Sequence, residues 1–140
     1  MLSLVLFSIA TMAQQRPGQE RIRSLKIAFL TERLALTSEE AQAFWPIYNE
    51  HEKTVEALRV REKQELAGRM ASLMDMSDGE ASKMLAKYMQ LMKEKQEAQQ
   101  RFVANLDGVI SPKKIILLIK SEEDFKKRLL QQFRKRRAGQ

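Results

Sequence analysis

The chain has 140 residues, of which 44% are hydrophobic and only 6% aromatic, and it carries a formal net charge of +7. This is one domain's worth of chain with enough apolar material for a modest core. Because there is no cysteine, disulfides, thiolate catalysis and cysteine zinc sites are excluded. Glycine and proline are scarce, while residues that lose least in a helix dominate, so the composition predicts an all-α fold.

The first thirteen residues form an uncharged segment with an apolar run from Leu2 to Ile9. The run is too short for a transmembrane helix, which needs about 20 apolar residues, but it suits a signal peptide. We expect cleavage after Ala13, a linker over 14–19 and export to the periplasm. No Lys or Arg precedes the run, and a buried N-terminal helix is the alternative.

Three helix-start signals follow the linker. Thr37 with Glu40, and Ser77 with Glu80, have the spacing of capping boxes, and Ser111 precedes a proline that suits the first helical position. Together with a start near Glu20, these signals predict four helices. We place them at 20–35, 38–74, 78–108 and 112–136, in a helical domain over 20–137.

The two long central helices each carry an apolar stripe with helical spacing. In 38–74 the stripe consists of Phe44, Tyr48, Val55, Leu58 and Leu66, and in 78–108 of Ala81, Leu85, Tyr88, Met92, Gln99, Phe102 and Leu106. The short link between the helices predicts a long antiparallel hairpin. Such a hairpin leaves apolar surface uncovered, so we also expect a homodimer.

Pro46 removes one backbone hydrogen bond inside the second predicted helix and should bend it beside three aromatic residues. Six of the eight methionines gather around the link between the two long helices, where flexible thioethers suit loose packing or varied partners. We therefore predict a client or partner surface from Phe44, Trp45, Tyr48, Met70, Met74 and Met84. Core packing of these side chains, or Cu(I) binding by the methionines, is the alternative.

The C-terminal segment 111–140 has a charge of +7, equal to that of the whole chain. Its basic residues interleave with Leu129, Leu130 and Phe133, a pattern typical of an amphipathic basic helix. We predict an anionic contact through Lys127, Arg134, Lys135 and Arg136. Anionic lipid, an acidic protein and nucleic acid all fit this pattern; we expect an anionic membrane surface and no nucleic acid, and a solvated helix end is the plain alternative.

No catalytic pattern is present in the sequence. His51 is the single histidine, and there is no glycine-rich phosphate loop or nucleophile elbow. We expect His51 to be a packed or partly exposed core residue. The chain is therefore predicted to be a binding protein rather than an enzyme, with no cofactor and no metal site of its own.

Two phrases resemble motifs of a known family. Residues 31–50, TERLALTSEEAQAFWPIYNE, and residues 106–114, LDGVISPKK, are similar to small exported helical proteins of Bacteroidota-type bacteria related to the Spy/CpxP periplasmic chaperones. The resemblance covers roughly residues 20–135. Where the family's leucine-threonine-x-x-glutamine motif has glutamine, this chain has Glu40 and Lys114, with Gln42 nearby. The resemblance implies a sensor associated with extracytoplasmic sigma factors, or a chaperone.

The leading hypothesis is thus an exported envelope-stress protein that binds unfolded clients or a signalling partner without ATP. A periplasmic heavy-metal sensor is the first alternative. A basic nucleic-acid-binding protein is the second, suggested by a helix-turn-helix pattern over 25–50 and a pI near 9.8. Against it, Glu39 and Glu40 at the start of the would-be recognition helix would repel phosphate.

Overall fold

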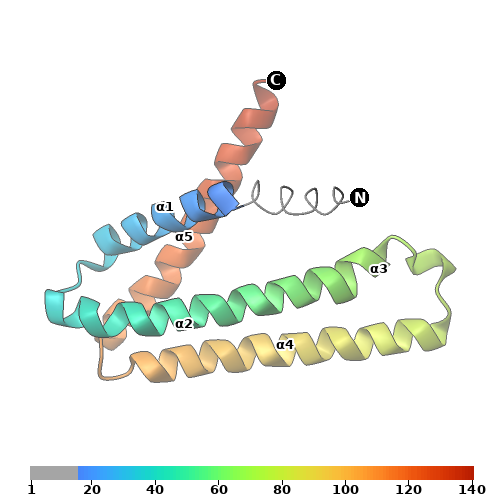
Figure 1. The fold of residues 1–140 in the computed structure, drawn as a ribbon, viewed down its shortest axis with the longest axis horizontal. Helices are drawn as coiled ribbons and strands as arrows, with labels where there is room; N and C mark the ends of the chain where they lie inside the picture. The colour runs from blue at the N-terminus through green and yellow to red at the C-terminus, as the bar shows by residue number, and fades with distance from the viewer. Residues whose placement is uncertain (1–15) are drawn as a thin grey trace, which may run out of the picture. The chain divides into compact units, whose positions relative to one another are not determined.

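The computed structural model describes residues 16–140, which are helical over most of their length (Figure 1). In chain order the elements are α1 (Arg16–Leu34), α2 (Ser38–Glu62), the π-helical turn η1 (Lys63–Ala67), α3 (Gly68–Met70), the 3-10 turn η2 (Leu73–Asp75), α4 (Asp78–Leu106) and α5 (Pro112–Ala138). Within the described range the only β-type pairing is an isolated bridge between Asp107 and Ile110. The all-α prediction is confirmed, whereas the predicted signal peptide, residues 1–13, lies outside the described residues.

The chain divides into two compact units. The terminal unit consists of residues 1–36 and 113–140, and the central unit of residues 37–112. The terminal unit therefore combines α1 with nearly all of α5, and the central unit contains everything from α2 to the end of α4.

Both predicted capping boxes are present. Thr37 accepts a hydrogen bond from the backbone N–H of Glu40, whose carboxylate accepts one from the N–H of Thr37. Ser77 and Glu80 form the same reciprocal pair at the start of α4. Because each pair satisfies backbone donors that a helix start would leave open, α2 and α4 begin where the sequence predicted.

Helix α1 begins at Arg16, so residues 16–19 of the predicted linker are helical. Pro17 is the second residue of this helix. A proline in the first helical turn costs nothing in hydrogen bonding, because the first four N–H groups have no partner inside the helix. The proline therefore permits an earlier start than the sequence pattern suggested.

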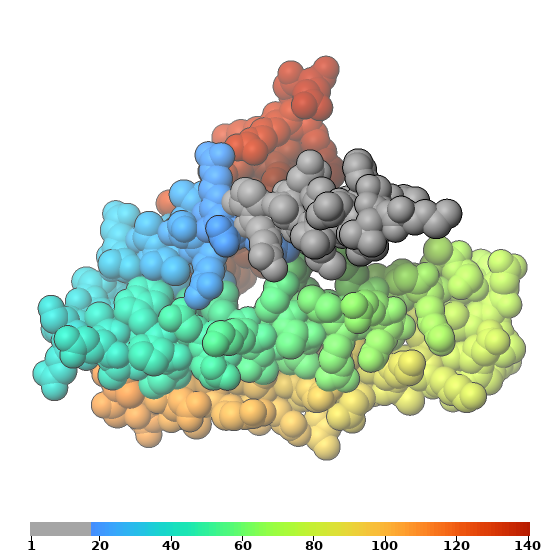
Figure 2. Space-filling view, viewed as in Figure 1, coloured from blue at the N-terminus to red at the C-terminus, as the bar shows by residue number. Residues whose placement is uncertain are grey.

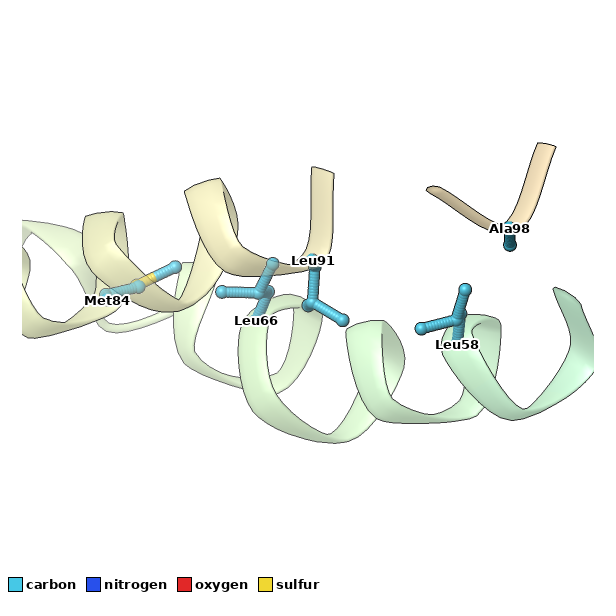
Figure 3. Packing of buried hydrophobic residues seen from close by; sticks show 5 residues of the cluster. All are labelled: Leu58, Leu66, Met84, Leu91 and Ala98. Carbon is cyan, nitrogen blue, oxygen red and sulfur yellow. The ribbon is translucent and has the colours of Figure 1, made fainter. Parts of the chain in front are cut away.

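In the central unit, α2 and α4 lie side by side and run in opposite directions (Figures 1 and 2). Their buried contact residues are Leu58, Leu66, Met84, Leu91 and Ala98. Leu66 lies against Leu91, and Leu58 points toward Ala98 (Figure 3). Interhelical ion pairs flank this core, with Arg61 on both carboxylate oxygens of Glu94 and Lys95 on Glu62.

The long second helix predicted over 38–74 is interrupted by the π turn η1. Leu58 and Leu66 are eight residues apart, which in a continuous α-helix turns the second side chain roughly 80° away from the first. A π turn has more residues per turn and absorbs about one of them. Both leucines consequently face α4 and are buried.

The stripe predicted for α4 is partly wrong. Leu85, Tyr88 and Met92 are exposed, and the buried positions are Met84, Leu91, Ala98, Phe102 and Leu106. The first three of these are seven residues apart, the spacing that keeps side chains facing a neighbouring helix. In α2, Val55 of the predicted stripe is also exposed, at 41%.

In the terminal unit, α1 and α5 also run in opposite directions, since Lys114 donates a hydrogen bond to the carbonyl of Ala35 and Lys26 pairs with Glu122. The rings of Phe29 and Phe125 pack with centroids 5.7 Å apart. The guanidinium groups of Arg33 and Arg128 lie about 5 Å from the Phe29 ring centroid. Aromatic and cation–π contacts thus join these two helices.

Candidate functional site

The aromatic residues beside Pro46 form a packed cluster. Phe44 and Tyr48 are buried and stack with centroids 5.6 Å apart, and the Trp45 ring meets both edge-on. Tyr48 also contacts Phe102 of α4. The prediction that Phe44 and Tyr48 form a binding surface is therefore wrong, because both rings are buried. Only Trp45 is partly exposed.

On the other side of Pro46, an open groove of about 470 Å³ lies between α2 and α4. Pro46, Ile47 and the stacked rings of His51 and Phe102 give it an apolar wall, and Glu50 and Arg101 add charged groups. The His51 and Phe102 rings are nearly parallel, with centroids 3.9 Å apart. His51 is half-buried and packs against Phe102, in agreement with the predicted packed or partly exposed core residue.

The methionine-rich tip, residues 70–76, is divided between surface and core. Met70 and Met74 are exposed, Met74 at 93%, in agreement with their predicted place on a surface. Met76 packs partly buried against the core of the central unit. Met84 is buried in that core, so its assignment to the binding surface is wrong: it belongs to the seven-residue repeat that faces α2.

An exposed apolar stripe runs along the first half of α4. Leu85, Tyr88, Met89 and Met92 are all at least two-fifths exposed. Their spacing of three and four residues puts them on one side of the helix, next to the face that packs on α2. Three of them, Leu85, Tyr88 and Met92, were predicted to lie in the buried seam. The seven-residue repeat of Met84, Leu91 and Ala98 is the sequence signal that separates the two faces.

The basic end of α5 is exposed. Among the predicted anionic-contact residues, Lys127 pairs with Glu123 at 3.2 Å on its own helix. Arg134, Lys135 and Arg136 are exposed and make no ion pair with any residue in the described part of the chain. Leu130 and Phe133 beside them are about half exposed. The predicted combination of free cations and apolar side chains is therefore present on this helix.

A groove of about 290 Å³ lies between the start of α1 and the end of α5. Its walls are mainly apolar, from Ile22, Leu25, Leu129 and Phe133, and Arg21 and Arg136 add the charges. This groove was not predictable from the sequence pattern, because it forms only when two segments about 110 residues apart lie together.

Surface ion pairs shift a few pKa values. A hydrogen bond from Arg59 lowers the pKa of Glu56, and a hydrogen bond from Lys120, aided by the charges of Lys120 and Arg33, lowers the pKa of Asp124. The hydrogen bond to Glu94 raises the pKa of Arg61. Each shift favours the charged form of a group in a salt bridge, which is a structural role.

Within residues 16–140 no cluster of three or more His, Asp or Glu side chains has the arrangement of a metal site. The same residues include no helix that is both long and apolar enough to cross a bilayer.

Comparison of the chain with protein-family models, with curated proteins and with solved structures gave no match. The resemblance to Spy/CpxP-like proteins therefore rests on the two motifs quoted above.

Proposed function

We propose that this protein binds apolar segments of unfolded proteins without ATP, through the exposed stripe of Leu85, Tyr88, Met89 and Met92 and the neighbouring Met70 and Met74. The stripe carries the proposal, because four large apolar side chains on one side of a helix cost solvation free energy unless a partner covers them. The sequence has no phosphate loop, so release has to follow from weak, exchangeable contacts.

The chemistry of the stripe suits varied partners. Methionine side chains are unbranched and adapt to irregular shapes, and a tyrosine ring gives a large contact area at low entropic cost. The core behind the stripe is fixed by Leu66 and Leu91, so the exposed side chains extend from a rigid helix. The binding surface is thus displaced from the aromatic cluster around Pro46 that the sequence indicated.

We place this activity in the cell envelope. The support is the apolar run Leu2–Ile9, which has the length of a signal-peptide core, and the two motifs that resemble exported stress proteins. The mature protein would begin at Gln14. Cell fractionation, with the N-terminal mass of the recovered protein, tests this; uncut protein in the cytosol would contradict it.

We further propose that α2 and α4 form a long antiparallel hairpin on which two copies pair through the α4 stripe when no client is bound. Dimerisation and client binding would then be alternatives at one surface. Light scattering at tens of micromolar should show a dimer that dissociates when client is added. A monomer at these concentrations would contradict the pairing and leave client binding to be tested separately.

The decisive experiment is suppression of aggregation of an unfolded model client by the purified protein and by a Leu85→Gln/Met89→Gln variant. The matched control is Ile116→Gln, because Ile116 is 68% exposed and Leu85 61%, but Ile116 lies on α5. We expect the α4 variant to lose most of its suppression with an unchanged melting temperature, and the control to keep it.

Two results would contradict the proposal. If the wild type never suppresses aggregation, the protein is not a chaperone, and a dedicated signalling partner becomes the better hypothesis. If the α4 variant and Ile116→Gln lose suppression equally, general surface hydrophobicity explains the activity and the stripe has no special role.

A further inference from the structure

The groove between α1 and α5 combines apolar walls with cations. Leu25 and Phe133 are about half exposed, and Arg21 and Arg136 lie among the residues that line it. Leu130, one turn before Arg134 on α5, is also half exposed. Exposing these apolar side chains to water is unfavourable, so their presence at the surface indicates a partner that covers them.

The cations themselves are in excess. The terminal unit contains fifteen Lys and Arg residues against five Asp and Glu. All three acidic residues of α5 are already in salt bridges, with Lys26, Lys127, Lys120 and Arg33 as partners. Beyond Asp124 no acidic side chain follows in the sequence. Part of the surplus positive charge therefore lies at the groove, on Arg21 and Arg136, and toward the end of α5.

The helix dipole explains only part of this arrangement. Cations in the last turn of α5 suit the negative end of its dipole, but Arg21 lies in the second turn of α1, near the positive end. Arg21 makes no ion pair with any residue that the structure describes. A cation at that position points to an external anion.

We propose that the terminal unit docks on an anionic phospholipid bilayer, with Leu25, Leu130 and Phe133 entering the headgroup region and Arg21, Arg134 and Arg136 contacting lipid phosphates. A bilayer surface provides negative charge and an apolar layer together, which matches this mixture of side chains. Nucleic acid would satisfy the arginines but offers no apolar layer to the two leucines. This inference is independent of client binding by the central unit.

The test is co-sedimentation of the protein with vesicles of phosphatidylglycerol mixed into phosphatidylcholine, compared with phosphatidylcholine alone. Each Lys or Arg near an anionic surface contributes about 1 kcal/mol, so Arg134→Gln/Arg136→Gln should weaken binding roughly 25-fold. Phe133→Gln should weaken it about tenfold, through lost apolar contact. High salt should abolish the effect of the charge variant but leave that of Phe133→Gln.

The matched control is Lys83→Gln/Lys87→Gln, which removes the same charge from exposed positions of α4 in the central unit. It should weaken binding less than threefold, and circular dichroism should show all variants folded. The residues before Arg16 are common to all variants, so they cannot produce a difference.

Three outcomes would overturn the proposal. One is an equal loss in the α4 control, which would mean that only net charge matters. Another is equal binding of the wild type to neutral vesicles. The third is tighter binding to duplex DNA than to anionic vesicles, with DNA displacing the vesicles, which would make the terminal unit a nucleic-acid surface.

Discussion

The two units of the chain distribute charge in opposite ways. The central unit has thirteen acidic and ten basic side chains, while the terminal unit has five acidic and fifteen basic ones. In the central unit, pairs such as Arg61 with Glu94 place opposite charges on either side of an apolar seam. In the terminal unit the three carboxylates of α5 are all in salt bridges, and cations remain. The terminal unit thus carries a net charge of +10 and the central unit −3, which indicates that an anionic partner would bind the terminal unit.

The units also differ in how they are held together. The α2–α4 contact is a leucine and methionine seam with seven-residue spacing, and the α1–α5 contact uses phenylalanine rings, cation–π contacts and salt bridges. Exposed ion pairs contribute little free energy, so burial of apolar side chains should dominate in both units. The buried leucines are Leu30, Leu34 and Leu118 in the terminal unit and Leu58, Leu66 and Leu91 in the central one.

The largest effect is expected at the seam. Leu91→Ala should lower the free energy of unfolding by about 3 kcal/mol, because it leaves a cavity between α2 and α4. Leu85→Ala, on the exposed stripe of the same helix, should change it by less than about 0.5 kcal/mol. Denaturant titration measures both values. Equal losses would mean that the stripe predicted from the sequence, and not the seven-residue repeat, faces α2.

Substitution of a buried polar residue in the terminal unit should raise the free energy of unfolding instead of lowering it. Ser121 is buried on α5, and its hydroxyl has no hydrogen-bond partner among the described residues. Ser121→Ala should raise the free energy of unfolding by about 1.5 kcal/mol, by removing an unsatisfied group and improving helix propensity. Ser82→Ala, at an exposed position of α4, should give only the propensity gain of about 0.5 kcal/mol. A destabilised Ser121→Ala protein would show that the hydroxyl has a partner in solution.

The residues that follow α4 and α1 allow a further comparison of the two units, since both have a positive φ. After α4, Gly108 has a φ of +78°, and after α1, Ala35 has a φ of +44°. The left-handed region suits glycine and costs other residues about 1 kcal/mol. Gly108→Ala should therefore destabilise by about 1 kcal/mol. Ala35→Gly should stabilise by about 0.5 kcal/mol, because relief of the left-handed strain exceeds the entropy that glycine adds to the unfolded chain. Thermal melts of the two variants should shift in opposite directions.

The smallest expected effect is the pH dependence of stability that arises from Asp124. The hydrogen bond from Lys120 lowers the pKa of Asp124, which also pairs with Arg33 across the α1–α5 contact. A lowered folded pKa means that the stabilisation is present above the unfolded value of about 3.9 and is lost as pH falls through the folded pKa. Asp124→Asn should thus slightly lower the melting temperature at pH 7, and this difference should vanish as the pH falls through the folded pKa of Asp124. The control, Glu56→Gln, removes an ion pair that lies within α2 alone. If Asp124→Asn changed the melting temperature by the same amount at every pH, the charge of the carboxylate would be irrelevant to stability.

Local signals predicted much of the fold. The starts of α2, α4 and α5 follow from Thr37, Ser77 and Ser111 with Pro112, because capping depends on residues only three or four apart. The free basic side chains of α5 were predictable too, since no acidic residue follows Asp124. The early start of α1 was missed, because a proline in the first turn reads equally well as linker or helix.

The candidate sites were less predictable. Apolar steps of three and four residues in α4 fit two adjacent stripes, and only the seven-residue repeat of Met84, Leu91 and Ala98 distinguishes the face that packs on α2. In α2, the sequence likewise did not show which face is covered, and Phe44 and Tyr48 were predicted on a surface although both are buried.

The sequence by itself determined the helical class, the capped helix starts and the basic character of the C-terminal segment, because each depends on residue type and on contacts within one turn. Only the tertiary structure decided which faces are buried, where the π turn corrects the register of Leu66, and that Arg21 lies near Arg136. These features depend on the direction from which a second helix approaches, and side chains far apart in the sequence set that direction through their packing.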